Sequence, residues 1–448
     1  MPAITDVGPR KSRSLASSIP RRRWRIALLL GVGVLVNFSD RVNLTVSHAA
    51  LHAEFGITDV TFGYLSAAYF WTYGLCQLPV GVVLDRFGVR RVGRISTFLW
   101  SVASLLAAVS PSLGSFFAAR LLLGIGEAPT FPANAKAVGK WFPPQERSFA
   151  TSIFDSSAKL ASAIGVPVIG VLLLRFGWRW SFAVTGVVSF LYFLLFFAVY
   201  RDPEDDPALT IEERNFIQHE ATQAVASRLA AEPKFLRLLT HRKVIGAAIG
   251  FGAYNYTFYL LLTWLPSYLA SELNIDMLHS FVYTGVPWIV ATITDLCIGG
   301  ILVDHLIKRG WNTNLVRRSV LIGGMVLGLG VLACARAHTP TTALVGITVS
   351  LAGLAAAAPV AWSLPSLISP AASVGTVGGI MNFSSQLSGL AAPIITGSVV
   401  FLTHSFAAAF YVAAAYLLIG IVAYVFLLGC IEIIDTSSPP LDLPSGAG

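Results

Sequence analysis

The sequence predicts an all-α polytopic membrane protein with twelve transmembrane helices, arranged as two pseudo-symmetric six-helix bundles. Of its 448 residues, 55% are hydrophobic and only 12% are charged, whereas an average soluble domain is about 25% charged. Apolar runs of the roughly 20 residues that a bilayer requires recur from Ile26 nearly to Cys430. Features of the first half also recur in the second half, offset by about half of the chain.

Turn residues and charge clusters divide the apolar sequence into twelve expected spans. Long unbroken runs favour helices, because the strands of a membrane barrel alternate polar and apolar residues over about ten positions. A helix also satisfies its own backbone hydrogen bonds in lipid. The expected spans are 26–46, 60–84, 92–113, 115–138, 148–174, 180–200, 244–271, 280–305, 319–336, 341–364, 373–401 and 405–430.

The distribution of Lys and Arg predicts the orientation in the membrane. These residues concentrate in the N-terminal tail, the central connection, and the second-to-third, fourth-to-fifth and eighth-to-ninth connections. The opposite connections hold only Arg175, Arg179 and Arg336. The positive-inside rule therefore places both termini in the cytoplasm. We expect the protein to lie in the inner membrane. The net charge of +8 reflects these loops and their contact with the lipid bilayer, and no nucleic acid partner is expected.

Composition divides the chain into five segments. We expect a cytoplasmic tail at 1–25, a six-helix bundle at 26–200, a linker at 201–243, a second six-helix bundle at 244–430 and a cytoplasmic tail at 431–448. Charged residues are enriched in the linker, and its pattern IEERNFIQHEATQAVASRLAAEPKFLRLL predicts amphipathic surface helices.

Weak internal repeats support a duplicated six-helix unit. One match pairs Gly81 and Asp85 with Gly300 and Asp304, and it gains weight only together with the others. Two further matches pair Ser181 and Phe182 with Ser405 and Phe406, and Pro167 with Pro393. A duplication of this kind places the substrate site between the halves, near the midplane.

The segment GVVLDRFGVRR, from Gly81 to Arg91, resembles the second-to-third loop signature of the major facilitator superfamily. Other segments narrow the resemblance to its anion:cation symporter family: NFSDRVNL, RLLLGIGEAPTFPAN, WFPPQER, YNYTFYLLLTWLPSYL and WSLPSLISPAASVGTVGGIMNF. The resemblance implies a secondary active transporter that takes up an organic anion, such as a sugar acid, hexuronate, aldarate or other carboxylate. It also implies proton coupling, alternating access and no cofactor.

The loop signature implies a gate between the halves. Gly81 would let helices approach closely, while Asp85 would pair with a helix end or with an arginine across the interface. An alternative reading is a basic loop that serves only the topology. The expected gating residues are Gly81, Asp85, Arg86, Arg90 and Asp304.

Asp40 and Arg41 lie about 15 residues into the first span, which at 1.5 Å per residue is past the midplane. An ionisable residue at that depth costs roughly 2.5 to 3.5 kcal/mol and therefore points to function. We predict that Arg41 binds the substrate carboxylate, because guanidinium offers a bidentate fork of donors and stays charged. The alternative is that Arg41 neutralises an acid elsewhere.

Glu127 is also expected near the middle of its span. A carboxyl group beside a cavity that fills and empties can take up and release a proton, because burial raises its pKa and a cation lowers it. The resemblance gives Asp40 and Glu127 the coupling role, with Arg120, two turns from Glu127, tuning the acid. A purely structural network of salt bridges is the alternative.

Lys159 is a third buried cation, one turn after Asp155. The two residues either neutralise each other as an i,i+4 pair, or Lys159 serves a substrate with two carboxylates. The resemblance assigns no role to Asp295 in the eighth span.

Polar and aromatic residues of other spans are expected to complete the pocket by stacking or hydrogen bonding. Tyrosines at span ends have an alternative role as anchors at the membrane surface. The expected residues are Tyr73, Tyr256, Tyr259, Trp362, Asn382 and Gln386.

Two other classes of function compete with uptake. An exporter or anion exchanger would use the same fold. A membrane enzyme or sensor is disfavoured, because the sequence has no GxSxG elbow, P-loop or cluster of metal ligands. The four cysteines are far apart in sequence and predict neither disulfides nor a metal site. We expect a monomer whose partners are a small organic anion, protons and lipid.

Overall fold

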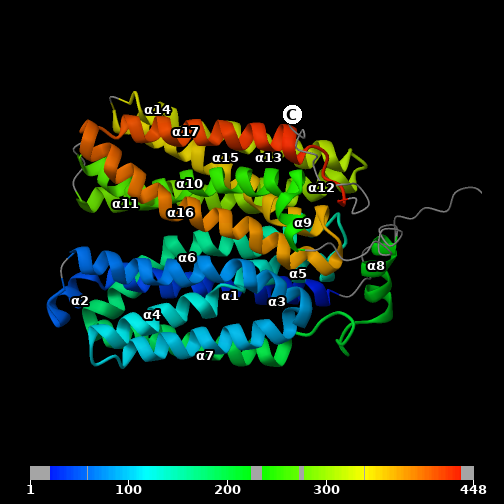
Figure 1. Cartoon of the computed structure of the whole chain (residues 1–448), viewed down its shortest axis with the longest axis horizontal. Helices are drawn as coiled ribbons and strands as arrows, with labels where there is room; N and C mark the ends of the chain where they lie inside the picture. Colours follow the sequence, from blue (N-terminus) through cyan, green and yellow to red (C-terminus); the bar gives the residue numbers. More distant parts are fainter. Residues whose placement is uncertain (1–20, 58, 223–234, 272–276, 338, 435–448) are drawn as a thin grey trace, which may run out of the picture.

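The structure, a computed structural model, describes residues 21–57, 59–222, 235–271, 277–337 and 339–434. These residues are almost entirely helical and contain no strand. The helices run roughly parallel to one long axis and form two layered bundles, one from each half of the chain (Figure 1). The predicted fold class is confirmed.

The first bundle contains α1, α3, α4, α5, α6 and α7, and a short helix α2 follows α1. Proline and glycine mark its breaks. Gly88 interrupts the long helix α3 with φ +78°, a conformation that glycine adopts without strain, and Ala128 and Pro129 separate α4 from α5. The bounds are Arg22–Val46, His48–Phe55, Asp59–Ala108, Leu113–Glu127, Thr130–Trp141, Arg147–Phe176 and Trp178–Val199 for α1 to α7.

The second bundle starts with α10, Arg242–Ser271, and α11, Met277–Thr294. A π-helical segment η2, Asp295–Leu302, and α12, Val303–Lys308, continue the rod of α11. The remaining elements are α13 Thr313–Gly328, α14 Val331–Cys334, α15 Pro340–Ile368, the 3-10 turn η3 Ala371–Ser373, α16 Val374–Thr403, α17 Ala407–Val422 and the π-helical η4 Ala423–Leu428.

Nine helices within the described residues are long and apolar enough to cross a membrane, or ten if the bent helix α6 counts as one span. The long helix α3 covers the second and third predicted spans on either side of Gly88. Helices α4 and α5 together cover the fourth span, although neither is long enough alone. These helices therefore account for all twelve predicted spans.

The linker contributes two helices, α8, Ile211–Thr222, and α9, Phe235–Thr240. Both lie toward the same end of the bundles, where α5 and α12 also lie (Figure 1). We refer to this end as the linker end and to the opposite end, which carries α2, as the far end. The predicted tails lie almost entirely outside the described residues, as does the part of the predicted linker helices at 223–234.

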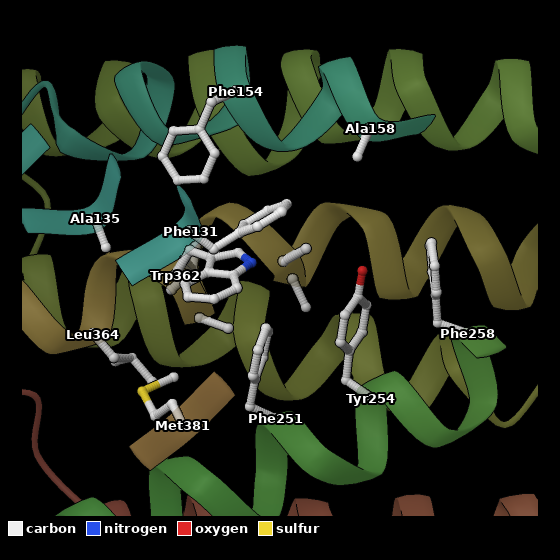
Figure 2. Packing of buried hydrophobic residues seen from close by; sticks show 14 of the residues in the cluster. Phe131, Ala135, Phe154, Ala158, Phe251, Tyr254, Phe258, Trp362, Leu364 and Met381 are labelled. Atoms are coloured by element: carbon white, nitrogen blue, oxygen red, sulfur yellow. The ribbon is translucent and has the colours of Figure 1, made fainter. Parts of the chain in front are cut away.

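Aromatic side chains pack where the two bundles meet. Trp362 of α15 stacks on Phe131 of α5 with 5.0 Å between ring centroids, and Phe251 of α10 meets Trp362 edge-on at 4.8 Å. Figure 2 shows that these rings lie on the linker side of Tyr254 and Phe258, which follow Phe251 along α10. The stack separates the middle of the molecule from the linker end.

Candidate functional site

A small cavity of about 40 Å³ lies between the bundles, next to this aromatic stack. Seven of the eight predicted substrate-binding residues line it: Arg41, Tyr73, Lys159, Tyr259, Trp362, Asn382 and Gln386. The structure does not bring the eighth, Tyr256, to the cavity. Its ring packs edge-on against Tyr416, with 5.5 Å between ring centroids.

Arg41 contacts Glu127, and both are predicted site residues. The Arg41 Nε donates to Glu127 Oε2 at 3.2 Å, and the Tyr69 hydroxyl donates to the same oxygen at 2.7 Å. Another guanidinium nitrogen, Nη2, donates to Asn37 Oδ1 at 3.0 Å. Glu127 is fully buried, whereas Arg41 reaches the cavity. The guanidinium therefore neutralises an acid and faces the space where a ligand would lie.

Three aromatic rings surround the Arg41 guanidinium. Its central carbon lies 4.4 Å from the ring centroid of Phe38, 4.9 Å from that of Tyr69 and 5.1 Å from that of Tyr73. Cation–π contacts of this kind favour a planar guanidinium held in one position. Lysine could not reproduce this arrangement.

Asp40 points away from the cavity, toward α7. The Ser189 hydroxyl donates to Asp40 Oδ2 at 2.9 Å, while Oδ1 is buried without a hydrogen-bond partner among the described residues. Arg120 is buried close to both predicted coupling acids and interacts electrostatically with Glu127 and Asp40. The structure therefore brings all three predicted coupling residues into one buried region beside Arg41.

Lys159 has two acidic partners. Its ammonium lies 2.5 Å from Asp155 Oδ2 and 2.7 Å from Asp295 Oδ2. The expected pair within α6 is present, and Asp295 from η2 of the second half completes it. Asp155 and Lys159 line the cavity. The sequence assigned no partner to Asp295, and the structure pairs it with Lys159.

Amide side chains connect the halves across the cavity. Asn382 Nδ2 of α16 donates to the Tyr73 hydroxyl at 3.2 Å and to Gln77 Oε1 at 2.9 Å. Gln386 lies one turn further along α16, with its Oε1 buried and without a hydrogen-bond partner among the described residues. These groups can exchange their internal hydrogen bonds for bonds to ligand hydroxyls.

Sequence reasoning missed Tyr69, Gln77 and Tyr254 as site residues. Tyr69, Tyr73 and Gln77 follow each other at intervals of four residues, so they share one face of α3. That spacing could have identified the other two once Tyr73 was chosen. Tyr254 lies one turn after Phe251 in a largely aromatic run, and its pattern gives no comparable signal.

At the linker end, Asp85 holds the first turn of a helix from the other half. The backbone N–H groups of Gly375 and Thr376, at the start of α16, donate to its carboxylate at 2.9 and 2.7 Å. Lys136 also forms an ion pair with Asp85. The expected partner of Asp85 was a helix end or an arginine of the other half, and the structure shows the helix end.

Gly81 lies at the same contact. A Cβ atom there would lie 2.8 Å from the Gly375 carbonyl oxygen and 2.9 Å from the Thr376 Cα, both backbone atoms. Since neither atom can move independently of its helix, α3 and α16 require glycine to approach this closely.

Asp304 makes the equivalent contact on the opposite side. The backbone N–H of Phe149 donates to Asp304 Oδ2 at 2.8 Å, and that of Ser148 donates to Oδ1 at 3.3 Å. Both donors belong to the first turn of α6, in the first half of the chain. We call the contacts of Asp85 and Asp304 the aspartate clasps. Each clasp pairs a carboxylate with the positive end of a helix dipole.

Arg86 and Arg90, the other predicted gating residues, are not part of the clasps. Arg90 forms an ion pair with Asp205 of the linker at 3.3 Å, and the Arg86 guanidinium lies over the ring of Phe87. The structure places these contacts within the first half and the linker.

The sequence model of the family described as the Major Facilitator Superfamily matches residues 29–393 of this chain. This chain belongs to the major facilitator superfamily. Among its relatives, an uncharacterized transporter of Bacillus subtilis, YybO, is 38% identical over 92% of this chain and 95% of its own length. A D-galactonate transporter of Escherichia coli is 31% identical, covering 92% and 97%, and a probable galactarate/D-glucarate transporter of Escherichia coli, GarP, is 31% identical, covering 92% and 95%.

Solved structures of the superfamily share the fold. The proton:xylose symporter XylE matches with a TM-score of 0.72 at 17% identity, over 92% of this chain and 97% of its own. FucP in its outward conformation matches with a TM-score of 0.67 at 14% identity, over 91% and 99%. The predicted resemblance is confirmed. The chain is a multi-pass membrane transporter, not an enzyme.

Proposed function

We propose that this transporter takes up a sugar acid together with protons, and that Arg41 binds the substrate carboxylate. The observation that carries the proposal is the contact between Arg41 and the buried acid Glu127 at the edge of the cavity. The names of the relatives, transporters of galactonate and of galactarate or glucarate, support a polyhydroxylated carboxylate as substrate.

Competition for the Arg41 guanidinium couples the substrate to the proton. Glu127 and the substrate carboxylate need the same N–H donors, and two anions beside one buried cation are unfavourable. Protonation of Glu127 removes its charge, so that Arg41 is released to bind the substrate. Loss of the proton on the other side restores the Arg41–Glu127 pair and expels the substrate. Asp40 and Arg120 set the charge around this exchange.

The direction of uptake requires the linker end to be cytoplasmic. The positive-inside distribution of Lys and Arg supports that topology, with both termini in the cytoplasm of the inner membrane. The aspartate clasps then close the cytoplasmic end. Release of substrate into the cell would require both clasps to open, as alternating access demands.

Reconstituted protein tests the proposal. Proteoliposomes with purified protein should accumulate D-galactonate, galactarate or D-glucarate when the outside is more acidic, and collapse of the pH gradient should stop accumulation. Glu127→Gln should lose gradient-driven accumulation but keep exchange of labelled for unlabelled substrate, because glutamine mimics the protonated acid. Accumulation that still follows the pH gradient in Glu127→Gln would contradict the role of Glu127. Exchange without any gradient-driven accumulation in the wild type would favour an anion exchanger.

A further inference from the structure

Asp155, Lys159 and Asp295 form a buried cluster of three ionisable groups, which we call the Asp–Lys–Asp cluster. Asp155 and Lys159 lie on α6 of the first half, and Asp295 is the first residue of η2 in the second half. The ammonium contacts a carboxylate oxygen of Asp155 at 2.5 Å and one of Asp295 at 2.7 Å. Their side chains are only 6%, 2% and 0% exposed. The cluster therefore joins the two halves through a buried contact.

The charges of the Asp–Lys–Asp cluster do not balance. Two carboxylates and one ammonium leave one negative charge, and an uncompensated charge inside a membrane protein is costly. The second carboxylate oxygen of Asp295, Oδ1, is fully buried and has no hydrogen-bond partner among the described residues. A proton on one of the two carboxyl groups removes the excess charge.

Among the residues whose side chains the structure describes, no second cation pairs with the cluster. Helix α15 packs against η2 and contains no ionisable residue between Pro340 and Ile368. Tyr254 of α10 interacts electrostatically with all three groups, and it is uncharged in its usual state. Arg41 and Tyr259 also line the cavity that Asp155 and Lys159 face, but Arg41 is paired with Glu127.

We propose that the Asp–Lys–Asp cluster is a proton-binding site whose proton is taken up and released in each transport cycle. It adds one proton to the proton carried by Glu127. The proton comes from water in the cavity, converts one carboxylate to a carboxylic acid and returns to water when the cavity faces the other side. Because the two carboxyl groups are coupled through Lys159, the proton belongs to the pair rather than to one residue.

Because the cluster spans both halves, its affinity for the proton should change when the transporter switches which side is open. Lys159 contacts one acid of its own half and one of the other half, so movement between α6 and η2 changes only the contact with Asp295. The structure begins its π-helical turn at Asp295, and such turns occur frequently at functional sites. This inference rests on the proposed proton-coupled uptake.

Proton release or uptake on substrate binding tests the inference directly. Purified full-length protein is placed in weakly buffered solution with a pH indicator and titrated with the best accumulated of D-galactonate, galactarate and D-glucarate. The wild type should take up protons, and Asp295→Asn and Asp155→Asn should each take up one proton fewer per bound substrate. Asp205→Asn is the matched control, because Asp205 is an exposed linker residue and this variant should equal the wild type.

Each outcome decides the inference. Asparagine mimics the protonated acid, so both variants must fold and bind substrate; failure to do either would overturn the proposal. An unchanged proton count in both variants would overturn it as well. If the wild type takes up no proton, the proposed coupling itself fails. If the wild type takes up protons and Glu127→Gln reduces the count while neither cluster variant does, only the proton site is wrong.

Discussion

Arg41 has two possible anionic partners, and its geometry lets it hold one of them fully at a time. Nη2 and Nε are already engaged by Asn37 and Glu127, and three rings fix the plane of the guanidinium. In the proposed cycle, a substrate carboxylate competes with Glu127 for these donors. This arrangement makes affinity depend on the shape of the guanidinium as well as on its charge.

Arg41→Lys should lose transport while the protein stays folded. Hydrogen bonds to charged groups contribute about 1.5 to 3 kcal/mol, so the loss of the fork should weaken substrate binding about 10- to 100-fold. Binding titrations and uptake in proteoliposomes measure the effect. Arg90→Lys, at an ion pair on the linker surface, is the control and should transport normally. Near-normal uptake by Arg41→Lys would refute the assignment.

Glu146 is a second residue whose charge has a testable consequence, outside the membrane-spanning segments. It bonds Arg23 at 2.7 Å and Lys308 of the other half at 3.0 Å. Burial alone would raise the pKa of Glu146, but the hydrogen bonds and charges of Arg23 and Lys308 outweigh burial and lower that pKa. Its ionised form therefore stabilises the fold above the pKa of the unfolded chain, and this stability is lost as the pH falls through the lower folded pKa.

Glu146→Gln should lower the melting temperature at pH 7, because breaking a buried ion pair costs about 3 to 5 kcal/mol. The difference from the wild type should shrink as the pH falls below about 4.5, where the unfolded chain takes up the proton, and should vanish below the lower folded pKa of Glu146. Thermal unfolding in detergent across this pH range provides the measurement. Glu204→Gln, at an exposed linker acid, should change little. A difference that does not depend on pH would contradict the ionic origin of the effect.

Single residues were predictable where the free-energy cost of burying a charge in the membrane identified them. Charges deep in apolar runs pointed to Asp40, Arg41, Glu127 and Lys159, and the structure gathers all four near one cavity. The partnership of Asp295 with Lys159 was not predictable, because it depends on which faces of two distant spans meet. Tyr256 was predicted to line the cavity and does not, because residue type alone could not tell which tyrosines of one helix face it.

At the scale of elements, each clasp joins one carboxylate to the end of a whole helix. Asp85 contacts backbone donors at the start of α16, which crosses the membrane and carries Asn382 and Gln386 into the cavity. One helix therefore carries both the contact at the linker end and residues that line the cavity. The strength of a clasp should bias which end of the transporter is open.

Asp85→Asn should favour opening of the linker end. A charge at a helix N-terminus contributes about 0.3 to 2 kcal/mol, so the population of the open form should rise by up to about 30-fold. Cysteine placed at Ser385, which lines the cavity, reports opening through its rate of labelling by a membrane-impermeant thiol reagent from the linker side. Asp205→Asn serves as the control. Labelling that is no faster in Asp85→Asn would show that the clasp does not hold this end closed.

Element bounds followed from the sequence because apolar runs end where charge and turn residues begin. The internal geometry of the elements did not follow. The eighth span changes from α- to π-helix at Asp295, and the fourth divides at Ala128 and Pro129. Such changes depend on packing against neighbouring helices, which a single run of residues does not encode.

At the scale of the whole molecule, the proposed cycle has the two bundles separate at the linker end. Arg147 joins them there, donating to the carbonyl oxygens of Gly139 in its own half and Ser366 in the other at 2.9 and 2.8 Å. A Cβ atom at Gly139 would lie 2.8 Å from the Ser366 Cβ. These two positions therefore report directly on the separation of the bundles.

Gly139→Cys combined with Ser366→Cys should stop transport when oxidised and recover it when reduced. A disulfide places its Cβ atoms about 3.5 to 4.5 Å apart, so a shift of about 1 Å accommodates it. The native cysteines at 76, 297 and 430, which are not fully buried, are first replaced. Each single variant under the same oxidant is the control. Full transport by the crosslinked protein would mean that the linker end does not open in the cycle.

The architecture was predictable as a whole because hydrophobicity, the charge of the loops and the internal repeat agree on it. What remained beyond prediction was the packing of one bundle on the other. That packing determines the cavity, the aromatic stack and the clasps, and it arises from side chains far apart in the chain.

The two clasps also have an evolutionary meaning. The internal repeat equates Asp85 with Asp304, and each aspartate holds the first turn of a helix in the opposite half. Reciprocal contacts of this kind are what a two-fold symmetric dimer makes, where each contact on one subunit occurs again on the other. One aspartate in a six-helix ancestor would suffice for both contacts in such a homodimer. On that basis, one contact inherited by both copies of a duplicated unit would be enough to close the linker end.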